Sequence, residues 1–341
     1  MAITISDVAR EANVSTSTVS KVLNHWSTIS PETCERVFQA IEKLNYVPNT
    51  RAVSFAKGST NTIIFLSRFE KEQAYQNPHM FDILCGAQQQ LAGLGYSLLI
   101  VGVPSNQSLP DFVHKIIMQK SADGIIIHGS AYIPALDSIL LSSDYPHILI
   151  GHPASSSRLC WIDTNNGLAG EFAASHMVEC GYKNVAFIGS QKAEHISTQR
   201  LNGFVGKMYQ YGFYLGDPLI GYTYSTIQDS YNTAYAMLNQ PMRPRGIVCE
   251  NNTIAIGVTQ AISALHLQIP DDIALLTFDI YPYSMIINPK PTVIDINVFD
   301  LGIQAANALI QKIHNPSLLL QSYTTLPVLI QGLTTQSPAS A

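Results

Sequence analysis

The sequence predicts two folds in one chain: an all-α three-helix unit at the N-terminus, followed by an α/β core of two doubly wound parallel-sheet subdomains. Residues 1–46 show helical periodicity, with a capping residue before each helical segment. From residue 62 onward, continuous apolar runs alternate with amphipathic stretches, which indicates parallel strands covered by helices on both faces. About ten strands are too many for one compact sheet, so we expect two subdomains.

The composition is that of a globular protein. The 341 residues are 46% hydrophobic and only 13% charged, which excludes a disordered chain and allows two or three domains. The five cysteines are odd in number and never spaced as CxxC, so we expect neither a disulfide framework nor a zinc site. No apolar stretch is long enough for a membrane span and no signal peptide is evident, which predicts a cytoplasmic protein.

The charge distribution is only weakly informative. The formal net charge is -5, and residues 1–60 contain six Lys or Arg against five Asp or Glu, a local charge of +1. This excess is far smaller than the basic patch that indicates nucleic-acid binding by itself. A nucleic-acid-binding hypothesis must therefore rest on motifs.

Three helices are predicted in the N-terminal unit from their first residues. Thr4 and Asp7 have the spacing of a capping box in front of the first helix. Ser15 is a suitable N-cap for the second helix, and Ser30, followed by proline, for a third that ends near Leu44. The first two helices are joined by a short turn.

The core is predicted from its apolar runs and the amphipathic segments between them. Strands are expected in the runs TIIFLS, YSLLIVGV, ADGIIIHG, HILIGH, NVAFIGS, GIVCEN and DIALLTFD, with late strands in TTLPVLIQGL. Helices are expected near residues 78–94, 108–120, 132–142, 167–180, 197–212, 229–239, 252–266 and 299–313.

The segment TISDVAREANVSTSTVSKVLN resembles the helix-turn-helix of the LacI/GalR family of bacterial transcription regulators, and SPETCERVFQAIEKLNYVPN resembles that family's third helix and the entry to its hinge. Shorter matches extend the resemblance along the chain: NPHMFDILCG, NNGLAGEFAASHMVECGY, RLNGF, CENNTIAIG and LLTFD. The resemblance implies a periplasmic-binding-protein-like core. It also implies a sequence-specific DNA-binding repressor whose operator affinity is controlled by a small molecule in the core cleft.

The resemblance further implies a division of the chain. The expected parts are a headpiece at residues 1–46, a hinge helix or linker at 47–60, an effector-binding and dimerisation core at 61–333, and a polar tail at 334–341. Within the core, the N-subdomain is expected at about 61–163 and 298–322, and the C-subdomain at about 164–294 and 323–333.

The family's base-reading positions fall on Thr16, Ser17 and Lys21 of this chain. A recognition helix presents its first turn to base edges in the major groove, where a lysine can donate to guanine. The positions that the resemblance assigns to phosphate contacts are Thr18, Ser20, Asn24, Ser30, Thr33, Tyr46 and Asn49. For each of these residues alone, a solvated polar side chain is the alternative.

The hinge departs from the family pattern. Family members commonly have Ala-Arg-x-Leu where this chain has AVSF at residues 52–55. Phe55 is in register with the leucine that wedges into the minor groove, so the resemblance implies an apolar wedge at this position. Packing of Phe55 on the core is the alternative.

The effector site is expected at the carboxyl ends of the core strands. By resemblance it includes Asp279, which ends LLTFD, and Arg200, which begins RLNGF; a carboxylate and a guanidinium can fix several hydroxyls. The other residues expected to bind the effector, with core packing as their alternative, are Asn251, Trp161, Tyr224 and Met80. Amides such as Asn165 and Asn252 replace common family carboxylates, so we expect a neutral sugar or glycoside.

Two other classes of function are considered. A solute-binding protein of a transport system would share the core architecture, but it needs a secretion signal and has no use for residues 1–60. An enzyme is the third class, but GxGxxG after a strand, the P-loop, GxSxG and HExxH are all absent from the sequence. We therefore expect no catalytic residue, no cofactor, no metal and no membrane partner.

The partners implied by the resemblance are palindromic operator DNA and a second copy of the chain. A single headpiece buries too little surface on DNA for operator selectivity, so two headpieces are needed across a palindrome. The C-terminal TTQSPASA contains no apolar heptad repeat, which predicts a homodimer rather than a tetramer.

Overall fold

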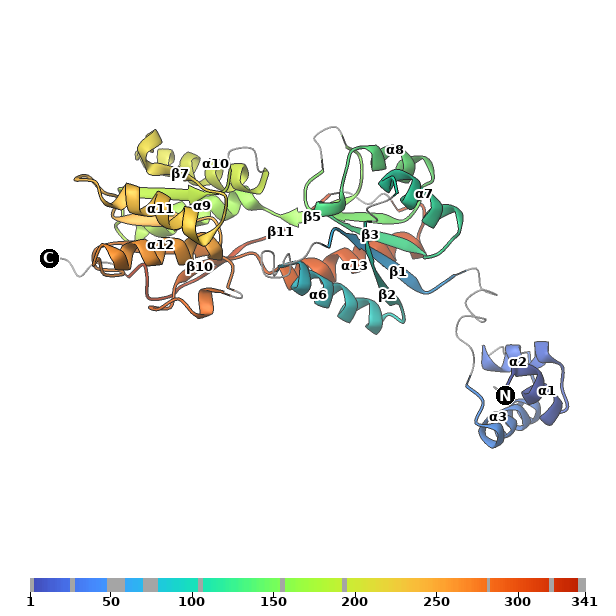
Figure 1. The fold of residues 1–341 in the computed structure, drawn as a ribbon. Helices are drawn as coiled ribbons and strands as arrows, with labels where there is room; N and C mark the ends of the chain where they lie inside the picture. Colours follow the sequence, from blue (N-terminus) through green and yellow to red (C-terminus); the bar gives the residue numbers. More distant parts are fainter. Residues whose placement is uncertain are drawn as a thin grey trace. The chain divides into compact units, whose positions relative to one another are not determined.

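The structure is a computed structural model that describes residues 3–24, 28–47, 59–69, 79–103, 107–153, 157–191, 195–280, 283–318 and 322–336. The chain divides into two compact units, Met1–Asn61 and Thr62–Ala341, and each has its own hydrophobic core. Figure 1 shows the helices of the first unit in blue, and the sheets and helices of the second unit in the later colours of the sequence. The predicted fold class, a helical headpiece and an α/β core, is confirmed.

The first unit consists of three short helices, α1 (Ile5–Glu11), α2 (Thr16–Leu23) and α3 (Pro31–Leu44). Its core is built from small and β-branched side chains that the three helices turn inward. The buried members are Val8, Ala9, Ala12, Val19, Val22, Val37 and Ala40. Because these side chains are small, the helices pack closely and their polar faces remain outside.

The predicted caps of these helices are present. The backbone N–H and the hydroxyl of Thr4 both donate to Asp7 Oδ2, at 3.0 and 2.7 Å, and these bonds hold the pKa of Asp7 below its usual range. Ser15 Oγ accepts from the backbone N–H of Thr18 at 3.1 Å. The turn between α1 and α2 contains Asn13 at a φ of 54°, a left-handed conformation that asparagine tolerates.

The second unit contains two six-stranded sheets, which define two lobes. The first lobe's sheet is entirely parallel and has the order β11-β5-β4-β3-β1-β2. Its strands are β1 (Thr62–Ser67), β2 (Ser97–Gly102), β3 (Gly124–His128), β4 (His147–Ile150), β5 (Trp161–Thr164) and β11 (Tyr323–Thr325). The central strands are the continuous apolar runs of the sequence, buried on both faces.

The second lobe's sheet has the order β12-β10-β9-β8-β6-β7 and is parallel except for the edge strand β12. Its strands are β6 (Val185–Gly189), β7 (Ile220–Tyr222), β8 (Gly246–Cys249), β9 (Ala274–Phe278), β10 (Thr292–Asp295) and β12 (Val328–Ile330). The antiparallel edge strand arises because the chain returns from the first lobe for its last segment.

Helices cover both faces of each sheet. In the first lobe they are α6 (His79–Gly93) and α13 (Val298–His314) on one face, with α7 (Leu109–Met118) and α8 (Ala135–Ser142) on the other. In the second lobe they are α9 (Asn166–Glu179) and α10 (His195–Gln210) on one face, with α11 (Ile227–Leu238) and α12 (Asn252–Ala264) on the other. Short 3-10 helices lie at Gly129–Ala131, Asp217–Leu219 and Tyr283–Met285.

The passages of the chain between the lobes differ slightly from expectation. The chain enters the second lobe after β5, returns after β10, and enters it again after β11. The first lobe was expected to end near residue 322, but β11 pairs with β5 and extends this lobe to Thr325. The short strands β5, β7 and β10 are absent from the predicted set, because three or four residues between polar segments give no clear periodicity.

No helix among the described residues is both long enough and apolar enough to cross a membrane.

Candidate nucleic-acid interface and ligand cleft

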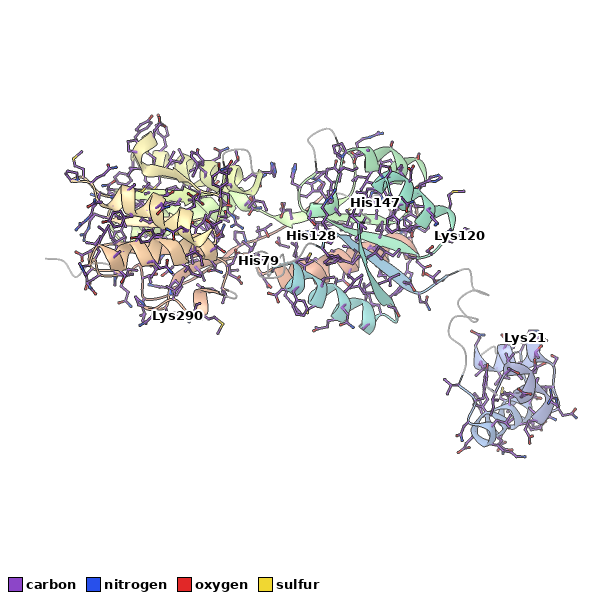
Figure 2. All side chains as sticks on the ribbon, viewed as in Figure 1. Lys21, His79, Lys120, His128, His147 and Lys290 are labelled. Atoms are coloured by element: carbon purple, nitrogen blue, oxygen red, sulfur yellow. The ribbon has the colours of Figure 1, made fainter. Side chains whose placement is uncertain are left out.

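The outer face of α2 carries the residues expected to read bases. Thr16, Ser17 and Lys21 are exposed, whereas Val19 and Val22 of the same helix are buried in the headpiece core. Figure 2 labels Lys21 on this helix. A helix packed on one face and polar on the other can enter a major groove without disturbing its own core.

Hydroxyl groups gather at the N-termini of α2 and α3. Ser15 Oγ lies 2.7 Å from Ser17 Oγ and 2.8 Å from Thr18 Oγ1, and Ser30 Oγ donates to Thr33 Oγ1 at 3.0 Å. Helix N-termini carry partial positive charge and attract anions such as phosphate. Both helix starts therefore have the chemistry of a phosphate contact.

The remaining residues expected at the DNA are arranged differently. Asn24 Nδ2 donates to the backbone carbonyl of Ser20 at 2.7 Å, so this amide helps to end α2. Tyr46 is half-buried and packs against the headpiece core, which leaves only part of its side chain for a partner. Asn49 and Phe55 lie outside the described residues.

A pocket of about 320 Å³ lies between the two lobes of the core. It is lined by both lobes, with His79, Asp82, Val298 and Phe299 from the first, Asp279, Ile280, Asp295 and Ile296 from the second, and Asn297 where the chain passes between them. Figure 2 shows His79 at the end of the first lobe that faces the second. The pocket lies at the carboxyl ends of β9 and β10, the position expected for a ligand of a doubly wound sheet.

Asp279 is the most constrained group of this pocket. Only 4% of the residue is exposed, and its Oδ2 lies 3.1 Å from Nε2 of His79. Its other oxygen, Oδ1, is buried and accepts no hydrogen bond from any residue that the structure describes. The backbone φ of Asp279 is +70°, in the left-handed region that non-glycine residues seldom occupy. Such strain is typical of functional sites.

In the His79–Asp279 pair, each side chain shifts the pKa of the other toward its charged form. Burial acts to lower the pKa of His79, but the charge of Asp279 and the hydrogen bond to it outweigh burial, and the pKa is raised. Burial acts to raise the pKa of Asp279, but His79 and then Arg200 outweigh it, and the pKa is lowered. The pair therefore favours an imidazolium on the first lobe facing a carboxylate on the second.

Arg200 is buried and does not line the pocket. Its Nε donates to Asn166 Oδ1 at 2.9 Å, and its Nη1 donates to the backbone carbonyl of Glu250 at 2.7 Å. The guanidinium carbon also lies 4.4 Å from the ring centroid of Phe278, the residue before Asp279. The expected effector-binding arginine thus braces the second lobe and supplies positive charge to the site.

Glu250 is a buried carboxylate that the sequence analysis did not single out. Both the backbone N–H and the hydroxyl of Ser190 donate to it, the hydroxyl at 3.2 Å, and the Ser197 hydroxyl donates at 2.6 Å. These bonds connect the end of β8 to the end of β6 and the start of α10. Glu250 therefore fixes the first turn of the helix that carries Arg200.

Two of the expected effector residues have other roles in the structure. Met80 is 6% exposed and lies in the first lobe's core, where the Ser67 hydroxyl is 3.1 Å from its sulfur. Met80 does not line the pocket as predicted. The preceding residue, His79, faces the pocket instead, because successive side chains of a helix point in different directions. Asn251 is the N-cap of α12 and accepts from the backbone N–H of Ile254 at 3.0 Å.

The two aromatic candidates are not among the residues that line the pocket. Trp161 is half-buried at the start of β5, and its ring centroid lies 4.5 Å from that of His152. Tyr224 is 74% exposed, and its backbone N–H donates to Asp229. Neither ring is positioned as a wall of the pocket.

The acidic lining of the pocket is the main departure from expectation. The amides in place of family carboxylates predicted few carboxylates in the cleft, yet Asp82 and Asp295 line the pocket together with Asp279. Asp295 could have been found by the same signal as Asp279, because Asp295 is the last residue of β10 and Asp279 directly follows β9. His79 and Asp82 gave no such signal, because their position depends on how the two lobes face each other.

Two protein-family models match the chain. The one described as bacterial regulatory proteins, lacI family, matches residues 4–49, and the one described as a periplasmic binding protein-like domain matches residues 174–335. The chain is 27% identical over 332 residues to the ribose operon repressor of Escherichia coli (strain K12), covering 96% of this chain and 98% of that protein. It is also 27% identical to the HTH-type transcriptional repressor PurR of Histophilus somni (strain 2336), covering 91% and 92%.

Solved structures match most or nearly all of the chain. The lac repressor dimer bound to operator and the anti-inducer ONPF is 20% identical with a TM-score of 0.80, covering 98% of this chain and 100% of that one. A LacI family regulator from Enterococcus faecium with bound ribose is 19% identical with a TM-score of 0.67, covering 81% and 99%. Headpiece, two-lobe core and full-length relatives agree, and the chain belongs to the LacI family of bacterial regulatory proteins.

Proposed function

We propose that this protein is a cytoplasmic transcriptional repressor that binds a palindromic operator as a homodimer and is controlled by a sugar or glycoside. One observation carries the proposal: the same chain combines two parts. A packed three-helix unit presents the polar face of α2, and a two-lobe core has a pocket between its lobes. A solute-binding protein of a transport system is the alternative. It would use the core and leave the headpiece without a role.

In this proposal, α2 is the recognition helix. Thr16, Ser17 and Lys21 read base edges, because they are the exposed side chains of its outer face. The residues proposed to contact phosphates are Thr18, Ser20, Asn24, Ser30, Thr33, Tyr46 and Asn49. Phe55 is proposed as the minor-groove wedge.

A homodimer is supported by exposed apolar side chains on the first lobe. Leu99 and Ile100 of the edge strand β2 are 48% and 53% exposed, and Phe81 on the adjacent helix α6 is 69% exposed. An unpaired edge strand beside apolar side chains favours burial against a second copy. Ile100→Lys is expected to yield monomers in sedimentation experiments and to weaken operator binding, because two headpieces must bind together.

The effector is proposed to bind in the pocket between the lobes, with Asp279 as its principal hydrogen-bond acceptor. Similar proteins bound to ribose and to cellobiose support a sugar. A ligand at this position changes the contact between the lobes and so shifts the population of their arrangements. Linkage then requires operator DNA to change effector affinity by the same factor.

Footprinting of the full-length protein on fragments of its own genome tests the proposal. We expect protection of a palindromic site, and a change in its affinity when one member of a sugar panel is added. A thermal-shift screen identifies that member, since a ligand at 100 times its Kd stabilises the fold by about 2.7 kcal/mol. Uniform, sequence-independent binding in the footprints would overturn the repressor assignment.

A further inference from the structure

We propose that the effector carries a positively charged nitrogen, as an amino sugar does, and that this group replaces His79 at the Asp279 carboxylate. The inference rests on the proposed function, because it names the chemical class of the ligand of the same cleft. It also reverses the expectation of a neutral sugar that the sequence suggested.

His79 and Asp279 lie on different lobes. His79 begins α6 of the first lobe, and Asp279 follows β9 of the second. Their atoms Nε2 and Oδ2 are 3.1 Å apart, and the second carboxylate oxygen, Oδ1, is buried. His79 and burial shield both carboxylate oxygens in this arrangement, so in this proposal the ligand bonds Asp279 when the lobes move apart and the imidazolium withdraws.

Withdrawal of His79 leaves the negative charge of Asp279 behind. Removing one partner of a buried ion pair leaves an uncompensated charge, which is strongly unfavourable. A sugar hydroxyl offers Asp279 a neutral hydrogen bond, whereas an ammonium group restores both the charge and a stronger, charge-assisted bond. We therefore expect the charged ligand to bind at least about 100-fold more tightly than its neutral counterpart.

The rest of the pocket lining offers no replacement for the positive charge of His79. Asp82 and Asp295 line it beside Asp279, and His79 is the one cationic side chain among its described lining residues. Arg200 does not take the place of His79, because its guanidinium already bonds Asn166 and the Glu250 carbonyl. Burial raises the pKa of Asp295, so Asp279 is the principal charge of the lining, and once His79 has moved away the described lining holds no cation of its own.

The apolar part of the lining favours an amino sugar over a flexible polyamine. The pocket is lined on other sides by the apolar residues Ile280, Ile296, Val298 and Phe299. Apolar surfaces suit the C–H faces of a sugar ring, and the single deep carboxylate suits one charged substituent on that ring. A linear polyamine would need carboxylates spaced along its whole length.

The test is calorimetric titration of the full-length protein with matched sugars. The pairs are D-glucosamine with D-glucose, D-galactosamine with D-galactose, and D-mannosamine with D-mannose. The N-acetyl form of each amine is added as a control that keeps the nitrogen but removes its charge. For at least one pair, we expect the amine to bind at least about 100-fold more tightly than both its parent sugar and its N-acetyl form.

Two variants separate charge recognition from a purely structural role. Asp279→Asn keeps the shape of the side chain and is expected to abolish the preference for the amine. His79→Gln removes the competing internal cation and is expected to strengthen amine binding, whereas a merely structural role for His79 would weaken it. His114→Gln, on the exposed side of α7, is the matched control and is expected to change nothing. If thermal unfolding shows that the Asp279→Asn variant is not folded, the effect of His79→Gln on amine binding decides between charge recognition and a structural role.

The other outcomes are also decisive. A neutral sugar that binds as tightly as its amine overturns the inference and leaves the repressor assignment intact. Absence of binding by every amine overturns it as well. Footprinting of operator DNA by the same preparation then shows whether the proposed function has failed with it.

Discussion

Gly203 of α10 packs directly against the backbone of Gly167 in α9, so a Cβ at position 203 would collide with the Gly167 carbonyl. Gly170 is placed in the same way against the carbonyl of Arg200. The two helices thus approach closely through glycines on both sides. This close contact sets the position of Arg200, whose side chain braces the second lobe behind Asp279.

Gly203→Ala is expected to destabilise the core by about 1–3 kcal/mol, because a methyl group at this crossing forces two backbones apart. Gly206 lies on the same helix, is exposed, and has open space where a Cβ would stand. Gly206→Ala is therefore the matched control and is expected to stabilise by about 0.5–1 kcal/mol. Urea denaturation measures both values. Equal effects of the two substitutions would show that the crossing is not tight.

Lys21→Ala is expected to weaken operator binding by about 1–3 kcal/mol, because it removes a donor to a base edge in the major groove. Gel-shift titration on the footprinted operator measures the loss. Lys183→Ala makes the same charge change at an exposed position of the core and is expected to leave operator affinity unchanged. Equal affinity of the Lys21 variant and the parent protein would remove Lys21 from the recognition surface.

The fold was predictable from the sequence because the signals that define it are local. A capping box such as Thr4 with Asp7, or a strand such as TIIFLS, depends on residues that are neighbours in the chain. No local signal predicts the strand partner of β11, because a three-residue segment can pair with the edge of either sheet. The boundary between the lobes was therefore expected three residues too early.

The site was less predictable than the fold, for a related reason. Asp279 follows a buried strand, and that position can be read from the sequence. His79 reaches Asp279 only because two lobes face each other, and no pattern along the chain encodes that contact. Met80 and His79 are adjacent and both suit a binding site, so only the helix rotation decides which faces the pocket.

Glu250→Gln is expected to destabilise the second lobe by about 1–3 kcal/mol. The carboxylate accepts from the Ser190 N–H, the Ser190 hydroxyl and the Ser197 hydroxyl, whereas the amide would turn an NH2 group toward some of these donors. Urea denaturation measures the loss. Glu179→Gln, at the exposed end of α9, is the control and is expected to have little effect. An equally small effect at position 250 would show that the hydrogen bonds are dispensable.

His128 is expected to make the core sensitive to acid. Burial lowers the pKa of its imidazole to about 4, while an unfolded histidine titrates near 6.5. The unfolded chain therefore binds a proton first, and stability is lost as pH falls from 6.5 toward 4. His128→Asn keeps an acceptor for the Ser130 N–H, which lies 3.2 Å from Nδ1, but cannot titrate. Unfolding free energies of this variant are expected to fall less than those of the parent over that range; an identical decline in both would contradict the assignment.

The His79 side of the bridge to Asp279 is expected to respond to pH in the direction opposite to His128. The pKa of His79 is raised in the fold, so its contribution is complete below 6.5 and is lost as pH rises through the raised value. The pKa of Asp279 is lowered, so its contribution is present above 3.8 and is lost as pH falls through the lowered value. Asp82, Asp295 and Arg200 also face or influence this pair, and they are retained in every variant.

The difference in unfolding free energy between the parent protein and His79→Gln measures this contribution directly. It is expected to be larger near pH 6 than near pH 9, because the imidazolium is the form that bonds Asp279. His114→Gln is again the matched control, since it makes the same substitution at an exposed position of α7. A difference for His79→Gln that stays constant or grows toward alkaline pH would mean that neutral histidine holds the lobes together, and the cationic character of this position would then be wrong.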